Sequence, residues 1–132
     1  MGYTHYWKTK RAFTEEEWKE FQNGTKKIIK ASDVTIKGGN GEGKPKFTDE
    51  YVCLNGDRSV GDDYETFYIT KEPTDFDFCK TARYPYDEVV CACLMLMEKI
   101  LGNDVEVSSD GDRETEEEWL KGIELFNKAI KK

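Results

Sequence analysis

The feature that most constrains the fold is the apolar run VVCACLMLM, from Val89 to Met97. Apolar side chains would surround a helix of this sequence on every side, which predicts a helix buried all round. Pro85 suits the start of such a helix because it has no N–H to leave unpaired there, and Gly102-Asn103 suits its end. A chain of 132 residues fits one domain, residues 1–132, so we expect a single core around this helix.

Two further helices are predicted from their capping residues. Thr14 with Glu17 three residues later forms a capping box, and Asn23-Gly24 is a candidate interruption of the helix that follows. Thr115 with Glu118 starts a last helix in the same way. Segments rich in β-branched and aromatic residues predict strands at 3–9, 48–54, 64–70, 75–80 and 105–108.

The order β-α-β-β-β-α-β-α that results predicts an α+β fold. In this fold a mainly antiparallel sheet of four to five strands packs against three helices. The pattern does not indicate whether the chain forms a homo-oligomer.

The charge is acidic and unevenly spread. The net charge is −7, which argues against direct binding of duplex nucleic acid, where neutralised phosphates supply most of the affinity. Residues 1–45 carry a net +3 and residues 46–132 a net −10. The acidic part is compatible with an ordinary solvated surface or with a basic partner protein.

The cysteines and the histidine favour no metal or cofactor. Cys53, Cys79, Cys91 and Cys93 form no C-x-x-C pair, and His5 is the only histidine, so we expect no tetrahedral zinc site. Reduced thiols and the lack of a secretion signal predict a cytoplasmic protein. The longest uncharged apolar stretch is that of the central helix, too short to cross a membrane.

The loop GGNGEGKPKF, residues 38–47, matches part of the phosphate-binding pattern G-x-x-x-x-G-K-[ST]. Pro45 occupies the position of the hydroxyl that would bind magnesium, and a predicted strand follows in place of a helix. We therefore interpret it as a flexible connection. Gly41, Gly43 and Lys44 make it a candidate lid over a ligand site.

The segment FCKTARYPYD, residues 78–87, is a stronger candidate for binding an anion. It places Lys80, Thr81 and Arg83 just before a helix N-terminus, where the helix dipole and free backbone donors favour negative charge. Tyr86 adds a ring that can stack or hydrogen-bond. In the alternative interpretation Arg83 pairs with Asp87 or Glu88 and Lys80 is solvated, so neither binds a ligand.

His5 and Tyr6 lie in an aromatic first strand. Alternation along a strand puts His5 on the face of Tyr3 and Trp7, and Tyr6 on the opposite face. One face must pack in the core, and the other could stack on a base or sugar. Any Ser-His-Asp or Cys-His catalytic group in this chain would have to use His5.

The chain also resembles a family of proteins through seven segments: GYTHYW (2–7), GEGKP (41–45), NG (55–56), ETF (65–67), FCKTAR (78–83), PYD (85–87) and SSDG (108–111). The family comprises small uncharacterised proteins found largely on bacteriophages, prophages and mobile elements. The resemblance implies a bacterial host cell and, by analogy of setting, antagonism of host defence. It implies no activity.

Three functions follow from these patterns. The first is a non-catalytic binding protein that captures a small anionic, nucleotide-like ligand with Lys80, Thr81, Arg83, Tyr86, His5 and Tyr6. The second is an acidic inhibitor of a host nuclease or nucleic-acid-binding defence protein. The third is a small nucleotide hydrolase that uses His5 as its acid or base.

Overall fold

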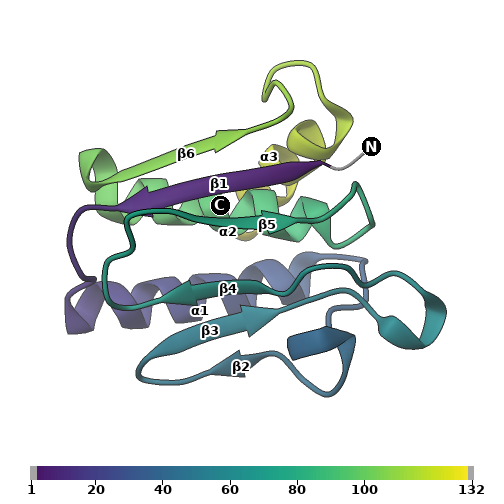
Figure 1. Cartoon of the computed structure of the whole chain (residues 1–132), viewed down its shortest axis with the longest axis horizontal. Helices are drawn as coiled ribbons and strands as arrows, with labels where there is room; N and C mark the ends of the chain where they lie inside the picture. Colours follow the sequence, from purple (N-terminus) through teal and green to yellow (C-terminus); the bar gives the residue numbers. More distant parts are fainter. Residues whose placement is uncertain (1–2, 131–132) are drawn as a thin grey trace.

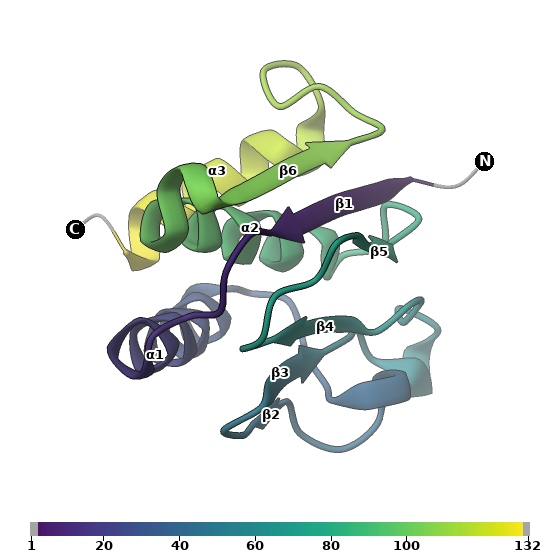
Figure 2. The same cartoon turned by 60° about the vertical axis from the view of Figure 1, so that its left-hand side comes forward.

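The computed structural model describes residues 3–130 and has two layers. The strands form one layer, and three helices cover one side of it: α1 (Glu15–Ala31), α2 (Asp87–Leu101) and α3 (Glu117–Ala129) (Figures 1 and 2). Gly2, the first residue of the GYTHYW segment, lies outside the described residues.

The strand layer consists of two three-stranded antiparallel sheets. One sheet has the order β5-β1-β6 and the other β2-β3-β4. The strands are β1 (Thr4–Thr9), β2 (Lys46–Phe47), β3 (Tyr51–Leu54), β4 (Phe67–Thr70), β5 (Asp77–Lys80) and β6 (Val105–Ser109). Short 3-10 turns lie at Gly39–Gly41, Arg58–Val60 and Gly102–Asp104. The α+β prediction is confirmed. The sequence pattern did not resolve the short β2 or the division of the strands between two sheets.

Helix α2 is the central element, as its apolar run predicts. Val89, Cys93 and Leu94 on it have no exposed surface, and it packs against α1, α3 and β6. Its neighbours approach it closely at glycines: a Cβ on Gly24 of α1 would lie 2.5 Å from Leu96 Cδ2. Asn23-Gly24 therefore does not interrupt α1. The glycine instead allows two helices to approach each other.

The two predicted capping boxes have different outcomes. At α1 the Thr14 hydroxyl accepts from the Glu17 N–H and the Glu17 carboxylate accepts from the Thr14 N–H, as predicted. At α3 the prediction is wrong, because the N-cap is Glu116 and it makes no side-chain capping bond. The Glu118 carboxylate binds Arg83 instead of returning to the backbone of Thr115.

No helix within residues 3–130 combines the length and the apolar surface needed to cross a bilayer.

Strand β1 has two faces with different surroundings. His5 and Trp7 point toward the helices and are buried, whereas Lys8 is exposed and Tyr6 half-buried on the other side. In the sheet register His5 lies opposite Cys79 and Ser109, and Tyr6 lies opposite Phe78 and Ser108. The inner and outer faces of β1 each form a candidate site.

Candidate functional site

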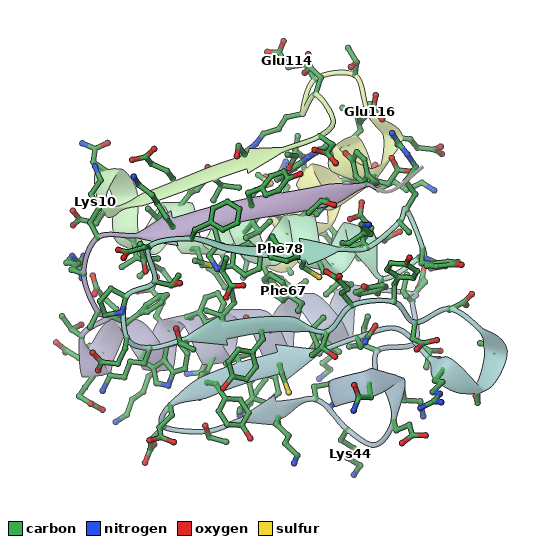
Figure 3. All side chains as sticks on the ribbon, viewed as in Figure 1. Lys10, Lys44, Phe67, Phe78, Glu114 and Glu116 are labelled. Atoms are coloured by element: carbon green, nitrogen blue, oxygen red, sulfur yellow. The ribbon has the colours of Figure 1, made fainter. Side chains whose placement is uncertain are left out.

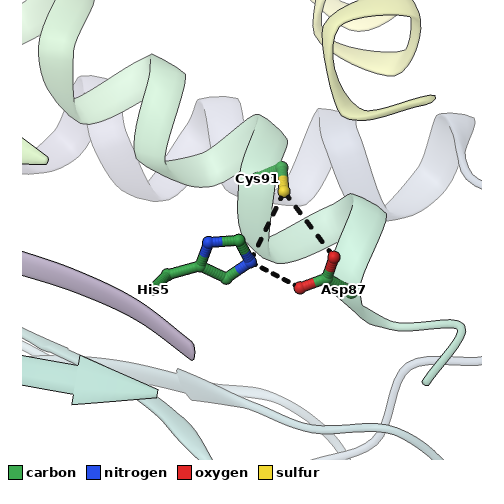
Figure 4. Close-up of side chains that lie close together, drawn as sticks. All are labelled: His5, Asp87 and Cys91. Carbon is green, nitrogen blue, oxygen red and sulfur yellow. Dashed lines mark hydrogen bonds and ion pairs between the residues drawn. The ribbon is translucent and has the colours of Figure 1, made fainter. Parts of the chain in front are cut away.

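The inner face holds a buried cluster of His5, Asp87 and Cys91, drawn in Figure 4. His5 Nε2 lies 2.5 Å from Asp87 Oδ1 and 3.6 Å from Cys91 Sγ. Cys91 Sγ lies 3.9 Å from Asp87 Oδ2. All three residues have 0% of their surface exposed. Three groups able to lose or share a proton therefore face one another inside the protein.

The fold brings these groups together from two elements. Asp87 and Cys91 are four residues apart on α2, so their side chains lie on one face of its first turns. His5 reaches them from the middle strand of its sheet. Asp87 is the first residue of α2 after its N-cap, where the helix dipole favours a carboxylate.

Further polar groups hold the cluster in place. The Thr81 hydroxyl donates to Asp87 Oδ1 at 2.5 Å, and His5 Nδ1 lies 2.5 Å from the Ser109 hydroxyl oxygen. The rings of Tyr3 and Trp119 meet the His5 ring edge-on, with centroids 5.2 and 5.3 Å away. The His5 ring is therefore held by contacts on several sides.

The cluster does not have the features of an activated cysteine. Burial, and then the charge of Asp87, raises the pKa of the Cys91 thiol well above its usual value. A reactive cysteine needs the opposite environment, electropositive and partly exposed. Cys91 and Asp87 also share the same nitrogen of His5, whereas a cysteine–histidine–carboxylate relay uses both nitrogens.

Ser109, His5 and Asp87 do form a hydroxyl–imidazole–carboxylate chain through both ring nitrogens. Ser109 shares the inner face with His5, however, because the residues of β6 alternate in the same way as those of β1. A hollow on the open side of the sheet is lined by Ser108, together with Tyr6 and Phe76. A substrate bound in that hollow would meet Ser108 and not Ser109, the serine that is linked to His5. The hydrolase hypothesis stays a prediction.

The predicted anion-binding residues lie in different environments. Thr81 and His5 do meet, but at the carboxylate of Asp87. The negative charge expected at this helix N-terminus is therefore present as one of the protein's own side chains. Tyr86 is buried, and its hydroxyl donates to the Glu65 carbonyl oxygen at 2.6 Å.

Arg83 lies at the surface and is paired with acidic side chains. Its Nη1 donates to Glu116 Oε1 and Glu118 Oε1, both at 2.6 Å, and its guanidinium lies 4.0 Å from the centre of the Tyr3 ring. The hydrogen bond to Glu116, and then the charges of Glu118 and Glu116, raise the pKa of Arg83. The alternative in which Arg83 forms an ion pair was correct in kind, but the partners come from α3 and its N-cap, not from α2.

The turn before α2 has an unusual backbone. Ala82 and Arg83 have φ of 52° and 64°, and the Tyr84 N–H donates to the Thr81 carbonyl oxygen across them. Hairpin turns with two positive φ values favour Asn-Gly, and a residue with a Cβ costs about 1–3 kcal/mol there. Surrounding contacts must therefore hold this turn, which directs Thr81 into the cluster.

The candidate lid lies away from Arg83. Figure 3 shows Lys44 at the edge next to β2, whereas Glu116, the partner of Arg83, is at the opposite edge. Gly41 and Gly43 have positive φ and line a separate surface hollow of about 460 Å³ with Lys37 and Arg58. The structure thus brings the loop residues together with charged neighbours of their own and not with His5 or Arg83.

The outer face of β1 holds the second candidate site, an aromatic row of Tyr6, Phe76 and Phe78. Ring centroids are 5.9 Å apart for Tyr6 and Phe76 and 6.0 Å for Phe76 and Phe78. Phe76 is 62% exposed and Phe78, labelled in Figure 3, is 49% exposed. Lys80 lies on the same face, two residues after Phe78. Two of the predicted ligand residues, Tyr6 and Lys80, are therefore neighbours of exposed rings.

Five residues of the two faces were not predicted from the sequence: Asp87, Cys91 and Ser109 on the inner face and Phe76 and Phe78 on the outer face. Two signals were present: the four-residue spacing of Asp87 and Cys91, and the alternation of residues 75–80. Neither signal shows that His5 lies beside them, because that contact joins residues 82 positions apart.

Comparisons with protein-family models, with curated proteins and with solved structures found no match to this chain.

Proposed function

We propose that this chain is a non-catalytic binding protein that captures a nucleotide-like ligand on the open face of the β5-β1-β6 sheet. The observation that carries the proposal is the exposed aromatic row of Tyr6, Phe76 and Phe78. Exposed apolar patches of this kind mark interaction sites, because contact between apolar surface and water is unfavourable.

The row suits a flat aromatic ligand. Its rings lie on one rigid surface, because Tyr6 and Phe78 are directly paired across neighbouring strands. Each base stacked on an aromatic side chain contributes about 1–3 kcal/mol, whichever base it is. Open sheet faces with aromatic residues are also the platform on which small RNA-binding domains stack bases.

The charges next to the row suit a phosphate. Lys80 is the next residue on the outer face after Phe78, at a spacing of about 7 Å along a strand. Lys8 lies beyond Tyr6 on the same face and forms only a long contact, 3.8 Å, with Glu106. A base on the rings would place its phosphate near one of these ammonium groups.

The proposal changes the roles of the other predicted ligand residues. His5, Thr81 and Tyr86 are buried, so they support the sheet and the turn behind it. In the setting that the sequence resemblance implies, the cytoplasm of a bacterial host cell, capture of a nucleotide would remove a defence signal.

Calorimetric titration with mononucleotides, cyclic mononucleotides and cyclic dinucleotides tests the proposal. We expect at least one class to bind, and Phe78→Ala to weaken that binding by about tenfold or more. Tyr68→Ala is the matched control, because Tyr68 is also exposed but stacks on Tyr51 in the other sheet. Lys80→Ala and Lys46→Ala form a second pair of test and control.

Two results would count against the proposal: no binding by any class, or equal affinity in Phe78→Ala and the parent. In the first case the acidic protein-inhibitor hypothesis would be preferred. It predicts salt-dependent binding of a basic protein that Lys80→Ala leaves unchanged.

A further inference from the structure

We propose that His5, Asp87 and Cys91 form a binding site for a zinc ion inside the protein. The inference does not depend on the ligand proposed for the outer face. It starts from convergence: one nitrogen, one carboxylate oxygen and one sulfur all lie within 4.8 Å of one another, and Figure 4 shows the three side chains facing a common point.

The separations can be compared with those around a tetrahedral zinc ion. Zinc bonds of about 2.0–2.1 Å to nitrogen and oxygen and about 2.3 Å to sulfur place neighbouring ligand atoms about 3.3–3.6 Å apart. His5 Nε2 and Cys91 Sγ are 3.6 Å apart, and Cys91 Sγ and Asp87 Oδ2 are 3.9 Å apart. Both separations from the sulfur, to the imidazole nitrogen and to the Oδ2 oxygen, are therefore within a few tenths of an ångström of the expected range.

The other oxygen of the same carboxylate, Asp87 Oδ1, lies 2.5 Å from His5 Nε2, which is a hydrogen-bond distance. For zinc bound through Oδ1 this separation would have to be longer by about 0.8 Å. Rotation of the Asp87 carboxylate at the start of α2 can lengthen this separation. The hydrogen bond between His5 and Asp87 is then replaced by a bond from each of them to the zinc ion. The Cys91 thiol gives its proton to solvent as the zinc–sulfur bond forms.

The types of ligand select the ion. Thiolate and imidazole are soft and intermediate donors, a set that favours zinc over magnesium or calcium. Asp87 and Cys91 occupy positions i and i+4 of a helix, the spacing with which helical metal sites present two ligands on one face. The Thr81 hydroxyl, 2.5 Å from Asp87 Oδ1, is a further oxygen beside these ligands.

The surrounding contacts are those that metal sites use to orient their ligands. A ligating histidine usually has its other ring nitrogen hydrogen-bonded, and a ligating carboxylate has a donor of its own. Here Ser109 contacts His5 Nδ1 and Thr81 contacts Asp87. All three ligands lie on a strand and a helix in the core, so the backbone that carries them is in place before an ion binds.

The test is titration of the chelator-treated full chain with Co²⁺ and then with Zn²⁺. We expect one equivalent of Co²⁺ to bind with the near-ultraviolet absorption of a cobalt–thiolate bond, and Zn²⁺ to remove that absorption by competition. Saturating Zn²⁺ should raise the unfolding midpoint by roughly 5–10 °C. Carboxylates on the surface bind Co²⁺ without the thiolate absorption, so the two sources of binding are distinguishable.

Cys91→Ser should abolish the cobalt–thiolate absorption, and Asp87→Asn should weaken Zn²⁺ binding about tenfold or more. Cys93→Ser is the matched control: it makes the same change at another fully buried position of the same helix and should keep the absorption. The proposal is overturned if the parent chain binds no stoichiometric Co²⁺ through a thiolate. It is also overturned if Cys91→Ser keeps the absorption, and the result for the parent chain stands even if a variant fails to fold.

Discussion

His5 and Tyr6 are consecutive residues of β1, yet their surroundings are opposite in kind. His5 is a polar side chain with no exposed surface, enclosed by Asp87, Cys91 and Ser109. Tyr6 is on the side of β1 where Phe76 and Phe78 remain largely exposed. The inner face thus buries polar groups among its apolar side chains and the outer face exposes aromatic rings beside its lysines, and each of these features departs from the ordinary distribution.

The difference shows what each face can contribute. A buried polar group must have partners, so the inner residues specify one another and can hold an ion without reaching solvent. The outer rings contact one another but keep much of their surface in water, so they are available to a ligand. The inner face therefore governs stability, and the outer face is where substitutions should alter binding without altering the fold.

The largest effect should come from a large apolar side chain on the inner face of β1. Trp7→Ala removes a buried ring that packs edge-on against Phe67 and should lower the free energy of unfolding by about 3–5 kcal/mol. Urea denaturation measures it. A loss below about 1 kcal/mol would mean that the two faces of β1 do not differ in the way described.

Substitution in the buried pair of His5 and Asp87 should have the next largest effect on stability. Asp87→Ala leaves the His5 ring and the Thr81 hydroxyl without their shared partner and should lower the free energy of unfolding by about 3 kcal/mol in the presence of a chelator. The double change of His5→Leu with Asp87→Leu removes the imidazole together with the carboxylate and takes partners only from the Thr81 hydroxyl and from the hydroxyl of the half-buried Ser109. It should therefore be less harmful than the single change, which leaves a buried imidazole without its carboxylate. If the double variant is the less stable of the two, unpaired hydrogen-bonding groups are not the cause of the destabilisation.

The strained turn should give a gain of stability. Ala82→Gly places a residue without a Cβ at a φ of 52°, which should raise the free energy of unfolding by about 1 kcal/mol. This turn begins at the inward Thr81, directly after the outward Lys80, so the change alters the backbone next to both faces. Ala12→Gly, in the loop before α1, should be neutral or destabilising under the same thermal denaturation.

The smallest effect on stability should be on the outer face. Phe76→Ser should change the free energy of unfolding by no more than about 0.5 kcal/mol, because most of the ring is already in water. Its effect on nucleotide binding should nevertheless be comparable with that of Phe78→Ala. Substantial destabilisation would show that the row is part of the core, and the proposed difference between the faces would then fail.

Local patterns along the sequence determined a large part of this architecture. The apolar run of α2, the capping box at Thr14 and the alternation of β1 each depend on residues within a few positions of one another. Periodicity tells which side chains share a face, so His5 was placed with Tyr3 and Trp7 and opposite to Tyr6. Strand β2 was not predicted because its two residues are too few to show an alternating pattern.

The tertiary structure alone decided which residues meet. Arg83 pairs with Glu116 and Glu118 because the loop before α3 passes beside the turn before α2, and nothing near Arg83 in sequence indicates those partners. His5 meets Asp87 and Cys91 because the middle strand crosses the first turns of the central helix. The spacing of residues along the chain determines which face of its own helix or strand a side chain is on. A contact between two elements depends instead on how the whole core packs. The sequence by itself therefore determined the two faces of β1, and only the packed core decided what each of them surrounds.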